Sequence, residues 1–212
     1  MILKNLGNIL KQMQFLAKKR KAPVISAEDS TKGNKFKILV FTMLSARTKD
    51  QTTIAVVNRL FSQAKGPKEI IKLGPKKLEK ILYGVGFYRV KTKNLLKMCN
   101  LLKDGQVPDS LEDLLKIPGV GRKTANIVLA RAFGKNTLGV DVHVHRISNR
   151  LGLVKTKKPE ETEEKLMKII PDKYIRKLNK TFVSFGQTVC LPRNPDCLNC
   201  PISDCCPKIG IF

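Results

Sequence analysis

The sequence is poor in acidic residues. It has 17 Asp and Glu against 41 Lys and Arg, which gives a formal net charge of +24 over 212 residues. An excess of this size favours a polyanionic partner, because it creates a positive potential over the protein surface. Adaptation to high temperature would normally raise the number of acids together with the bases. The composition therefore predicts a nucleic-acid-binding protein first, and a protein of anionic membrane surfaces second.

The sequence also lacks long apolar runs. No stretch of about 18 apolar residues occurs, so we expect no helix that spans a bilayer. Residues 1–20 alternate apolar and basic side chains. They have neither the apolar core nor the small-residue cleavage site of a secretory signal. Without such a signal, clustered cysteines favour a metal site over disulfides.

Strand patterns are nearly absent as well. Only residues 140–144 alternate apolar and polar side chains, and a helix start competes there. Helical periods and start signals predict an all-α fold of many short helices. The segments expected to be helical are 3–20, 36–44, 51–61, two short helices opening at Pro67 and Pro75, 89–103, 108–115, 122–133, 142–150, 159–170 and 173–189.

Two local patterns refine this prediction. Thr48 and Gln51 have the spacing of a capping box, in which the Thr side chain accepts a hydrogen bond from the N–H group three residues on. Residues 26–33 are polar and are expected to form a loop.

The most informative turn reads L-K-I-P-G-V-G-R-K-T-A, residues 115–125. Gly119 and Gly121 carry no Cβ, so they allow positive φ and a close approach of another molecule. The helix predicted from Arg122 presents N–H groups in its first turn, which can bind an anion. Lys123 lies in that turn, where the helix dipole disfavours the ammonium form and favours a nucleophilic amine. Taken alone, such a turn is more often structural.

Five of the six cysteines crowd together, as Cys190-x6-Cys197-x2-Cys200-x5-Cys206 with Cys205 beside the last. Four thiolates in so short a segment can surround one metal centre. A zinc ribbon usually has two C-x2-C pairs on separate arms, so an iron–sulfur cluster fits at least as well. The spacing alone leaves both the metal and the choice between Cys205 and Cys206 open.

Asp141 lies in the stretch G-V-D-V-H-V-H-R and is a good N-cap for the helix 142–150. Backbone N–H groups at that position stabilise an ionised carboxylate. Capping alone would explain the residue, but an ionised Asp can also orient an amine or stabilise a cation. His143 and His145 are two residues apart on a helix and face different sides, which argues against a metal pair.

Together these motifs resemble the endonuclease III family, within the helix–hairpin–helix, Gly/Pro-rich and Asp superfamily of DNA glycosylases. The order and spacing of I-P-G-V-G-R-K-T-A, V-D-V-H-V-H-R and the cysteine loop match, and so do M-L-S-A-R-T-K-D and Y-G-V-G-F-Y-R-V-K. The resemblance implies two helical lobes. Residues 27–138 would carry the helix–hairpin–helix, formed by helices 108–115 and 122–133, and residues 1–26 with 139–212 would carry the cluster loop.

The resemblance also implies roles for single residues. Lys123 occupies the position of the family's nucleophilic lysine, which attacks C1′ of a flipped-out nucleotide. A Schiff base then forms, and β-elimination cuts the strand. Asp141 occupies the position of the family's catalytic aspartate, which helps to activate the lysine and stabilises positive charge at the sugar. The implied [4Fe-4S] ligands are Cys190, Cys197, Cys200 and Cys206, which leaves Cys205 as a non-ligand.

Further residues match the family's DNA contacts: Gly119, Val120, Gly121, Arg122 and His143. Arg47 stands in the loop that fills the gap left by the flipped base, where family members often have Gln. Phe87 stands where an apolar residue wedges into the opposite strand, although it fits an ordinary core aromatic equally well. Arg193 is the only basic residue between the first two clustered cysteines and is offset by Asp196, so this part of the DNA contact is expected to be weak.

The resulting prediction is a bifunctional DNA glycosylase with AP lyase activity that removes oxidised pyrimidines. Its partner would be double-stranded DNA with damaged bases or abasic sites. We expect a cytoplasmic, nucleoid-associated monomer of a prokaryote, with no membrane partner. A mismatch-specific or adenine-type glycosylase is an alternative, but a monofunctional enzyme would replace Lys123 by Ser or Tyr, and the adenine type needs a Glu where Phe41 and Thr42 stand. A non-catalytic helix–hairpin–helix DNA-binding protein would not need Lys123 together with Asp141. A zinc-binding nucleic-acid module would be colourless, whereas a [4Fe-4S] protein is brown.

Overall fold

The computed structural model describes residues 2–31 and 33–211, with the side chains of 27–29 left out. Within these residues the protein is all-helical and contains no strand, which confirms the predicted fold class. The chain forms two compact units, one of Met1–Ile25 with Asn136–Phe212 and one of Ser26–Lys135. No helix of the described residues has the length and apolar character that crossing a membrane requires.

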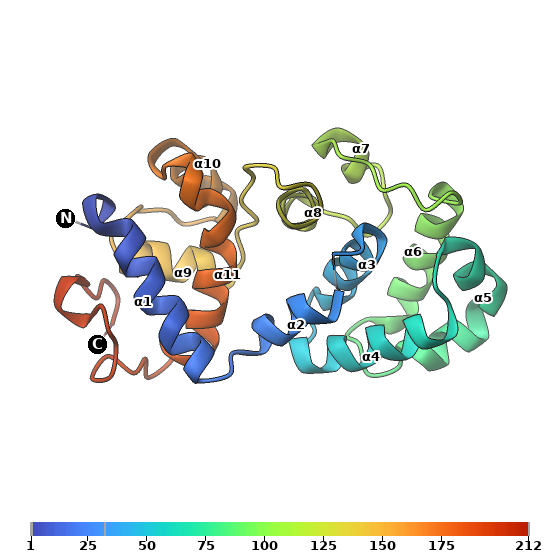
Figure 1. Ribbon diagram of the computed structural model, residues 1–212, viewed down its shortest axis with the longest axis horizontal. Coiled ribbons are helices and arrows are strands. Elements are labelled where there is room, and N and C mark those ends of the chain that lie inside the picture. Colours follow the sequence, from blue (N-terminus) through green and yellow to red (C-terminus); the bar gives the residue numbers. More distant parts are fainter. Residues whose placement is uncertain (1, 32, 212) are drawn as a thin grey trace. The chain divides into compact units, whose positions relative to one another are not determined.

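The unit Ser26–Lys135 is built around one buried helix, α3 (Figure 1). Its helices are α3 (Lys35–Ser45), α4 (Asp50–Gln63), α5 (Pro67–Leu82), α6 (Tyr88–Leu101), α7 (Leu111–Leu115) and α8 (Arg122–Phe133). Helix α3 is buried all round because α4, α6 and α8 pack against it. An apolar run without a polar face, as in α3, is typical of a helix at the centre of a core. The packing of α8 on α3 fixes the helix that carries Lys123.

The other unit packs four helices in sequence-distant pairs (Figure 1). They are α1 (Leu6–Lys19), α9 (Val142–Arg150), α10 (Pro159–Ile169) and α11 (Asp172–Thr188), with short 3-10 turns at Leu3–Asn5 and Ser203–Cys205. Helix α11 contacts both α1 and α9, and α9 also contacts α10. Met13, Phe182 and Phe185 are fully buried where these helices meet. This packing places the start of α9, and with it Asp141, on a rigid support.

The predicted loop 26–33 is wrong over most of its length. Helix α2 (Pro23–Thr31) occupies that segment. The first helix ends at Lys19, and Pro23 opens the second, because proline suits the first helical position. The Val24 N–H group, 3.2 Å from Oε1 of Gln187, ties this start to α11. The polar composition of this segment therefore belongs to a helix and not to a loop.

The predicted capping box at Thr48 is also wrong. Helix α4 begins at Asp50 with Lys49 as its N-cap residue, and the Thr48 hydroxyl accepts a hydrogen bond from the Gly86 N–H group at 3.1 Å instead. A partner far away in sequence has taken the place of the local one. The two proline starts are confirmed, because α5 contains a break at Gly74, with φ 71° and ψ 165°, immediately before Pro75.

Candidate active site and metal centre

The turn before α8 is anchored by two buried side chains. Ile117 and Val120 belong to the core of their unit, and the Val120 N–H group donates to the Ile117 carbonyl at 3.0 Å. The residues that follow, Gly121 to Lys123, are exposed. Lys123 is the second residue of α8. The turn therefore holds the start of α8 and its lysine at the surface, while the buried Val120 side chain is not available to a ligand.

The two turn glycines serve different purposes. Gly119 has φ +86°, and a Cβ there would lie 2.9 Å from Nδ2 of Asn94 and 3.3 Å from Sδ of Met43. Gly121 has φ −91°, and a Cβ there would meet nothing within 4 Å. Only Gly119 uses the positive φ that the sequence analysis allowed for both. Since the chain itself does not require a glycine at 121, the open space in front of α8 is available to another molecule.

Asp141 caps α9, as predicted. Its Oδ1 accepts hydrogen bonds from the N–H groups of His143 and Val144, both at 2.9 Å. These bonds fix the half-buried carboxylate at the helix start. Lys123 belongs to the unit Ser26–Lys135 and Asp141 to the other unit.

The two histidines of α9 have separate partners. Nδ1 of His143 lies 3.2 Å from a guanidinium nitrogen of Arg146, and Nδ1 of His145 lies 2.7 Å from Oγ1 of Thr162. Gly186 on α11 permits the close packing of His143, because a Cβ on Gly186 would lie 2.5 Å from its Nδ1. This packing holds the His143 side chain, in the first turn of α9, against α11.

Arg47 and Phe87 lie side by side on two different loops of one unit. The guanidinium carbon of Arg47 is 5.6 Å from the centre of the Phe87 ring. Phe87 is 61% exposed, so the reading of Phe87 as a core aromatic is wrong. Both residues have left-handed backbones, with φ 53° for Arg47 and 59° for Phe87. Such a conformation costs a non-glycine residue about 1 kcal/mol or more and persists only where its surroundings enforce it.

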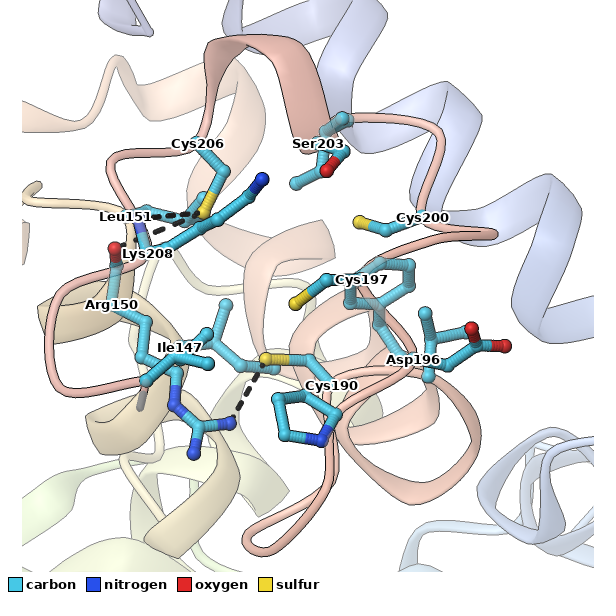
Figure 2. Close-up of a pocket in the computed structure, with 15 residues that line it drawn as sticks. Ile147, Arg150, Leu151, Cys190, Asp196, Cys197, Cys200, Ser203, Cys206 and Lys208 are labelled. Carbon is cyan, nitrogen blue, oxygen red and sulfur yellow. Dashed lines mark hydrogen bonds between the residues drawn. The ribbon is translucent and has the colours of Figure 1, made fainter.

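Four of the five clustered cysteines line one pocket of the C-terminal loop (Figure 2). Cys190, Cys197, Cys200 and Cys206 share it with apolar side chains that include Phe185 and Ile202. The described Cys205 is not among the lining residues, and its Sγ contacts the Ile202 carbonyl at 3.4 Å. The space measures about 380 Å³, including the part open to solvent.

The pocket brings together four thiols, which are a donor type of metal centres. In the described part of the chain no three His, Cys, Asp or Glu side chains form a group that could hold one metal ion. Burial raises the pKa of the Cys200 thiol to about 11, and it raises the pKa of the Cys206 thiol as well. Thiols of this kind give up their protons to a cation, because metal binding competes with protonation. Iron–sulfur clusters are held by cysteine thiolates, so the donor set of the pocket fits such a cluster.

Two of the four sulfur atoms accept a hydrogen bond. The Lys208 N–H group donates to Sγ of Cys206 at 3.4 Å, and Arg150 donates to Sγ of Cys190 at 3.3 Å (Figure 2). Arg150 also donates to the carbonyls of Leu191 at 2.6 Å and Pro192 at 2.9 Å. Hydrogen bonds to ligand atoms of this kind orient the ligands and tune a bound cluster.

The expectation that Asp196 offsets Arg193 is wrong. Asp196 forms an ion pair with Arg20, at 2.5 Å, and the hydrogen bond from Arg20 lowers the pKa of the Asp196 carboxyl group. Arg20 also donates to the Thr188 carbonyl at 2.8 Å and so ties the end of α1 to the end of α11 as well. Arg193 is exposed in the same loop, and its positive charge remains available to a polyanion.

Among the described residues, sequence reasoning missed two buried cations, Lys91 and Arg150, each 8% exposed. Charged residues on a helix are usually solvated, so neither residue was expected to be buried. A signal for Lys91 was present, because it falls on the same helical face as Leu95 and Met98. A lysine at a core position of a helical period is expected to have specific acceptors.

Comparisons with known proteins match this architecture. The family profile described as "HhH-GPD superfamily base excision DNA repair protein" matches residues 40–172. Endonuclease III of Thermotoga maritima is 47% identical over 174 residues, covering 81% of this chain and 82% of that protein. A solved structure of a trapped endonuclease III–DNA covalent intermediate, an estranged-adenine complex, is 37% identical with a TM-score of 0.77, covering 82% of this chain and 84% of that one. A non-covalent endonuclease III–DNA complex is 33% identical with a TM-score of 0.78, covering 89% and 95%. The chain therefore belongs to the endonuclease III family of the HhH-GPD superfamily of base excision DNA repair proteins.

Proposed function

We propose that this chain removes oxidised pyrimidines from double-stranded DNA and cuts the strand with Lys123 as the nucleophile. Membership of the endonuclease III family makes it a DNA glycosylase with AP lyase activity. The observation that carries the assignment of Lys123 is its exposed position in the first turn of α8, after a turn anchored by Ile117 and Val120. The covalent DNA intermediate trapped in a relative supports a nucleophile that bonds to the DNA.

In the proposed reaction the neutral Lys123 amine attacks C1′ of the flipped-out nucleotide, and the bond from C1′ to the base breaks. The base leaves with the electrons of that bond and takes up a proton. The sugar ring opens and the lysine becomes a protonated Schiff base. Loss of a C2′ proton then expels the 3′ phosphate by β-elimination, and hydrolysis of the Schiff base restores the lysine. The Asp141 carboxylate stabilises the positive charge that develops at the sugar.

Contacts to the DNA backbone are proposed for the start of α8. The N–H groups of a first helical turn and the positive end of the helix dipole favour a phosphate. Gly119, Gly121 and Arg122 would border that phosphate, with Val120 contributing only as a buried anchor. His143 and Arg193 are proposed as contacts from the other unit.

Arg47 and Phe87 are proposed to replace the flipped base and to wedge the opposite strand. Their adjacency at 5.6 Å, and the exposure of Phe87, suit a pair of side chains that enters a base stack together. The adenine described as estranged in the trapped complex of a relative supports such a role.

We also propose that Cys190, Cys197, Cys200 and Cys206 bind a [4Fe-4S] cluster. The shared pocket and the donors around two of the sulfur atoms support this ligand set. Bound there, the cluster would cross-link the loop between the first and last ligand and provide a redox centre. In this proposal Arg150 and the Lys208 N–H group orient the ligand sulfur atoms, and Cys205 remains a free thiol.

The test combines a substrate panel with covalent trapping. Duplexes would carry thymine glycol, 5-hydroxycytosine, uracil, a G·T mismatch, 8-oxoguanine or an abasic site. We expect cleavage of the first two and of the abasic duplex, and borohydride trapping that Lys123→Ala abolishes. Lys116→Ala is the matched control, because Lys116 is exposed and pairs with the exposed acids Glu112 and Asp113. Trapping that persists in Lys123→Ala would identify another amine as the nucleophile, and a preference for uracil or G·T would overturn the substrate class.

A further inference from the structure

The end of α3 is held by a lysine from α6. Nζ of Lys91 donates hydrogen bonds to the carbonyls of Leu44 at 2.7 Å and Ala46 at 2.5 Å, and to Oγ1 of Thr48 at 3.2 Å. The last carbonyls of a helix lack intrahelical partners and carry the negative end of its dipole, so an ammonium group there is stabilised. The three donors of the ammonium group thus reach three acceptors of one short segment, which contains Arg47.

The same segment is tied to the second loop through Thr48. Its hydroxyl donates to the Ala46 carbonyl at 3.3 Å and accepts from the Gly86 N–H group at 3.1 Å. Gly86 also approaches the Arg47 carbonyl so closely that a Cβ on Gly86 would lie 2.5 Å from that oxygen. Since Gly86 directly precedes Phe87, the hydrogen bonds join the backbone around Arg47 to the backbone around Phe87.

These contacts enforce two unfavourable backbone conformations. Arg47 and Phe87 both have positive φ, at 53° and 59°, and neither would keep it without support. Burial lowers the pKa of Lys91 to about 8, so the ammonium form still predominates at neutral pH. An apolar residue at position 91 would fill the space, but it would remove the Lys91 donor from the buried Leu44 carbonyl of α3.

We propose that Lys91 is a positioning residue that holds Arg47 and Phe87 in the conformation in which they enter the base stack. Lys91 acts through Thr48 and the two loops and does not touch the DNA. The inference rests on the role proposed for Arg47 and Phe87, and it assigns the element that sets their geometry. A merely structural role for Lys91 would instead lower stability without a selective effect on base unstacking.

The first test uses Lys91→Met, which keeps the length of the side chain and removes its donors. Lys97→Met is the matched control, because Lys97 is exposed on the same helix. The probe is a duplex with 2-aminopurine opposite a tetrahydrofuran abasic analogue, whose fluorescence rises when the base is unstacked. We expect Lys91→Met to lose most of this rise at saturating protein and to excise thymine glycol at least about tenfold more slowly in single turnover, which corresponds to about 1.4 kcal/mol of barrier.

Trapping on single-stranded abasic DNA separates positioning from chemistry, because that substrate has no opposite strand to wedge. We expect Lys91→Met to trap there like the wild type. Equal loss on single-stranded and duplex DNA would overturn the inference, and so would an unchanged fluorescence rise. If the wild type neither excises nor traps, the proposed function has failed instead.

A second comparison guards against misfolding of Lys91→Met. Thr48→Val removes the bridging hydroxyl at nearly constant volume, whereas Thr48→Ser retains it. We expect the Val variant to lose unstacking and the Ser variant to keep it; equal behaviour of the two overturns the inference. In the double variant of Lys91→Met with Phe87→Ala, the excision rate should resemble that of Phe87→Ala alone, because both changes act on one wedge. Fully additive losses would show that Lys91 acts elsewhere.

Discussion

Replacing Asp141 with Asn should remove most of the turnover and leave the fold intact. The structure separates the two roles of this residue, since one oxygen, Oδ1, accepts both capping hydrogen bonds, from the N–H groups of His143 and Val144. Asn is as good an N-cap residue as Asp. Its amide oxygen can accept the same bonds, but it carries no negative charge to stabilise a cationic sugar.

The expected magnitudes differ accordingly. Asp141→Asn should change stability by less than about 0.5 kcal/mol, whereas Asp141→Ala should cost about 1 kcal/mol through the lost cap. For a chain of this length a loss of 1 kcal/mol lowers the melting temperature by about 2–4 °C. Both variants should slow single-turnover excision by about a hundredfold or more, since each removes a charge that acts on the transition state.

The assay compares melting temperature, DNA affinity and single-turnover excision for the two variants. Asn34→Ala is the matched control, because Asn34 caps α3 by accepting from the Lys37 N–H group at 2.9 Å and its loss should lower stability without slowing excision comparably. Turnover of Asp141→Asn within about threefold of the wild type would refute the catalytic assignment. A collapse of DNA affinity in parallel with turnover would show that Asp141 mainly supports the fold.

Three other predictions follow from the geometry. Gly119→Ala should destabilise the protein by about 1 kcal/mol or more, because φ is positive and Nδ2 of Asn94 lies 2.9 Å from the added methyl group. Gly121→Ala should have the melting temperature of the wild type and weaker DNA binding. Equal melting temperatures of the two variants would contradict this prediction. In anaerobically purified protein, Cys205→Ser should keep the absorption near 400 nm and Cys200→Ser should lose it. The reverse pattern would show that Cys205 is a ligand and Cys200 is not. The logarithm of DNA affinity should fall steeply and linearly with the logarithm of salt concentration, because several phosphates are neutralised; a flat response in a titration would contradict the role given to the net charge of +24.

Helix boundaries were predicted best where the signal is local. The observed α8 and α9, Arg122–Phe133 and Val142–Arg150, coincide with the predicted segments. Gly134, with φ +69°, ends the first, and the Asp141 cap opens the second. Signals of this kind lie within a few residues of the boundary they set, so they survive without knowledge of the fold.

Predictions failed where a distant partner competed with a local one. Thr48 has the spacing of a capping residue, yet its hydroxyl serves Gly86 and Lys91. Asp196 stands three residues from Arg193, yet it pairs with Arg20 near the other end of the chain. A side chain with two possible partners takes the one that packing brings within reach, and sequence spacing carries no information about that choice.

The sequence by itself determined the all-α class, the family, the anionic partner indicated by the charge, and the candidate lysine, aspartate and cysteines. These depend on residue types at short, fixed spacings, which a linear chain displays completely. Only the tertiary structure decided that Arg47 lies against Phe87, that Lys91 and Thr48 join their loops, and that Cys205 lies outside the pocket of the other four cysteines. The physical reason is that hydrogen bonds and ring contacts reach only a few ångströms, so folding must first bring together segments that are dozens of residues apart.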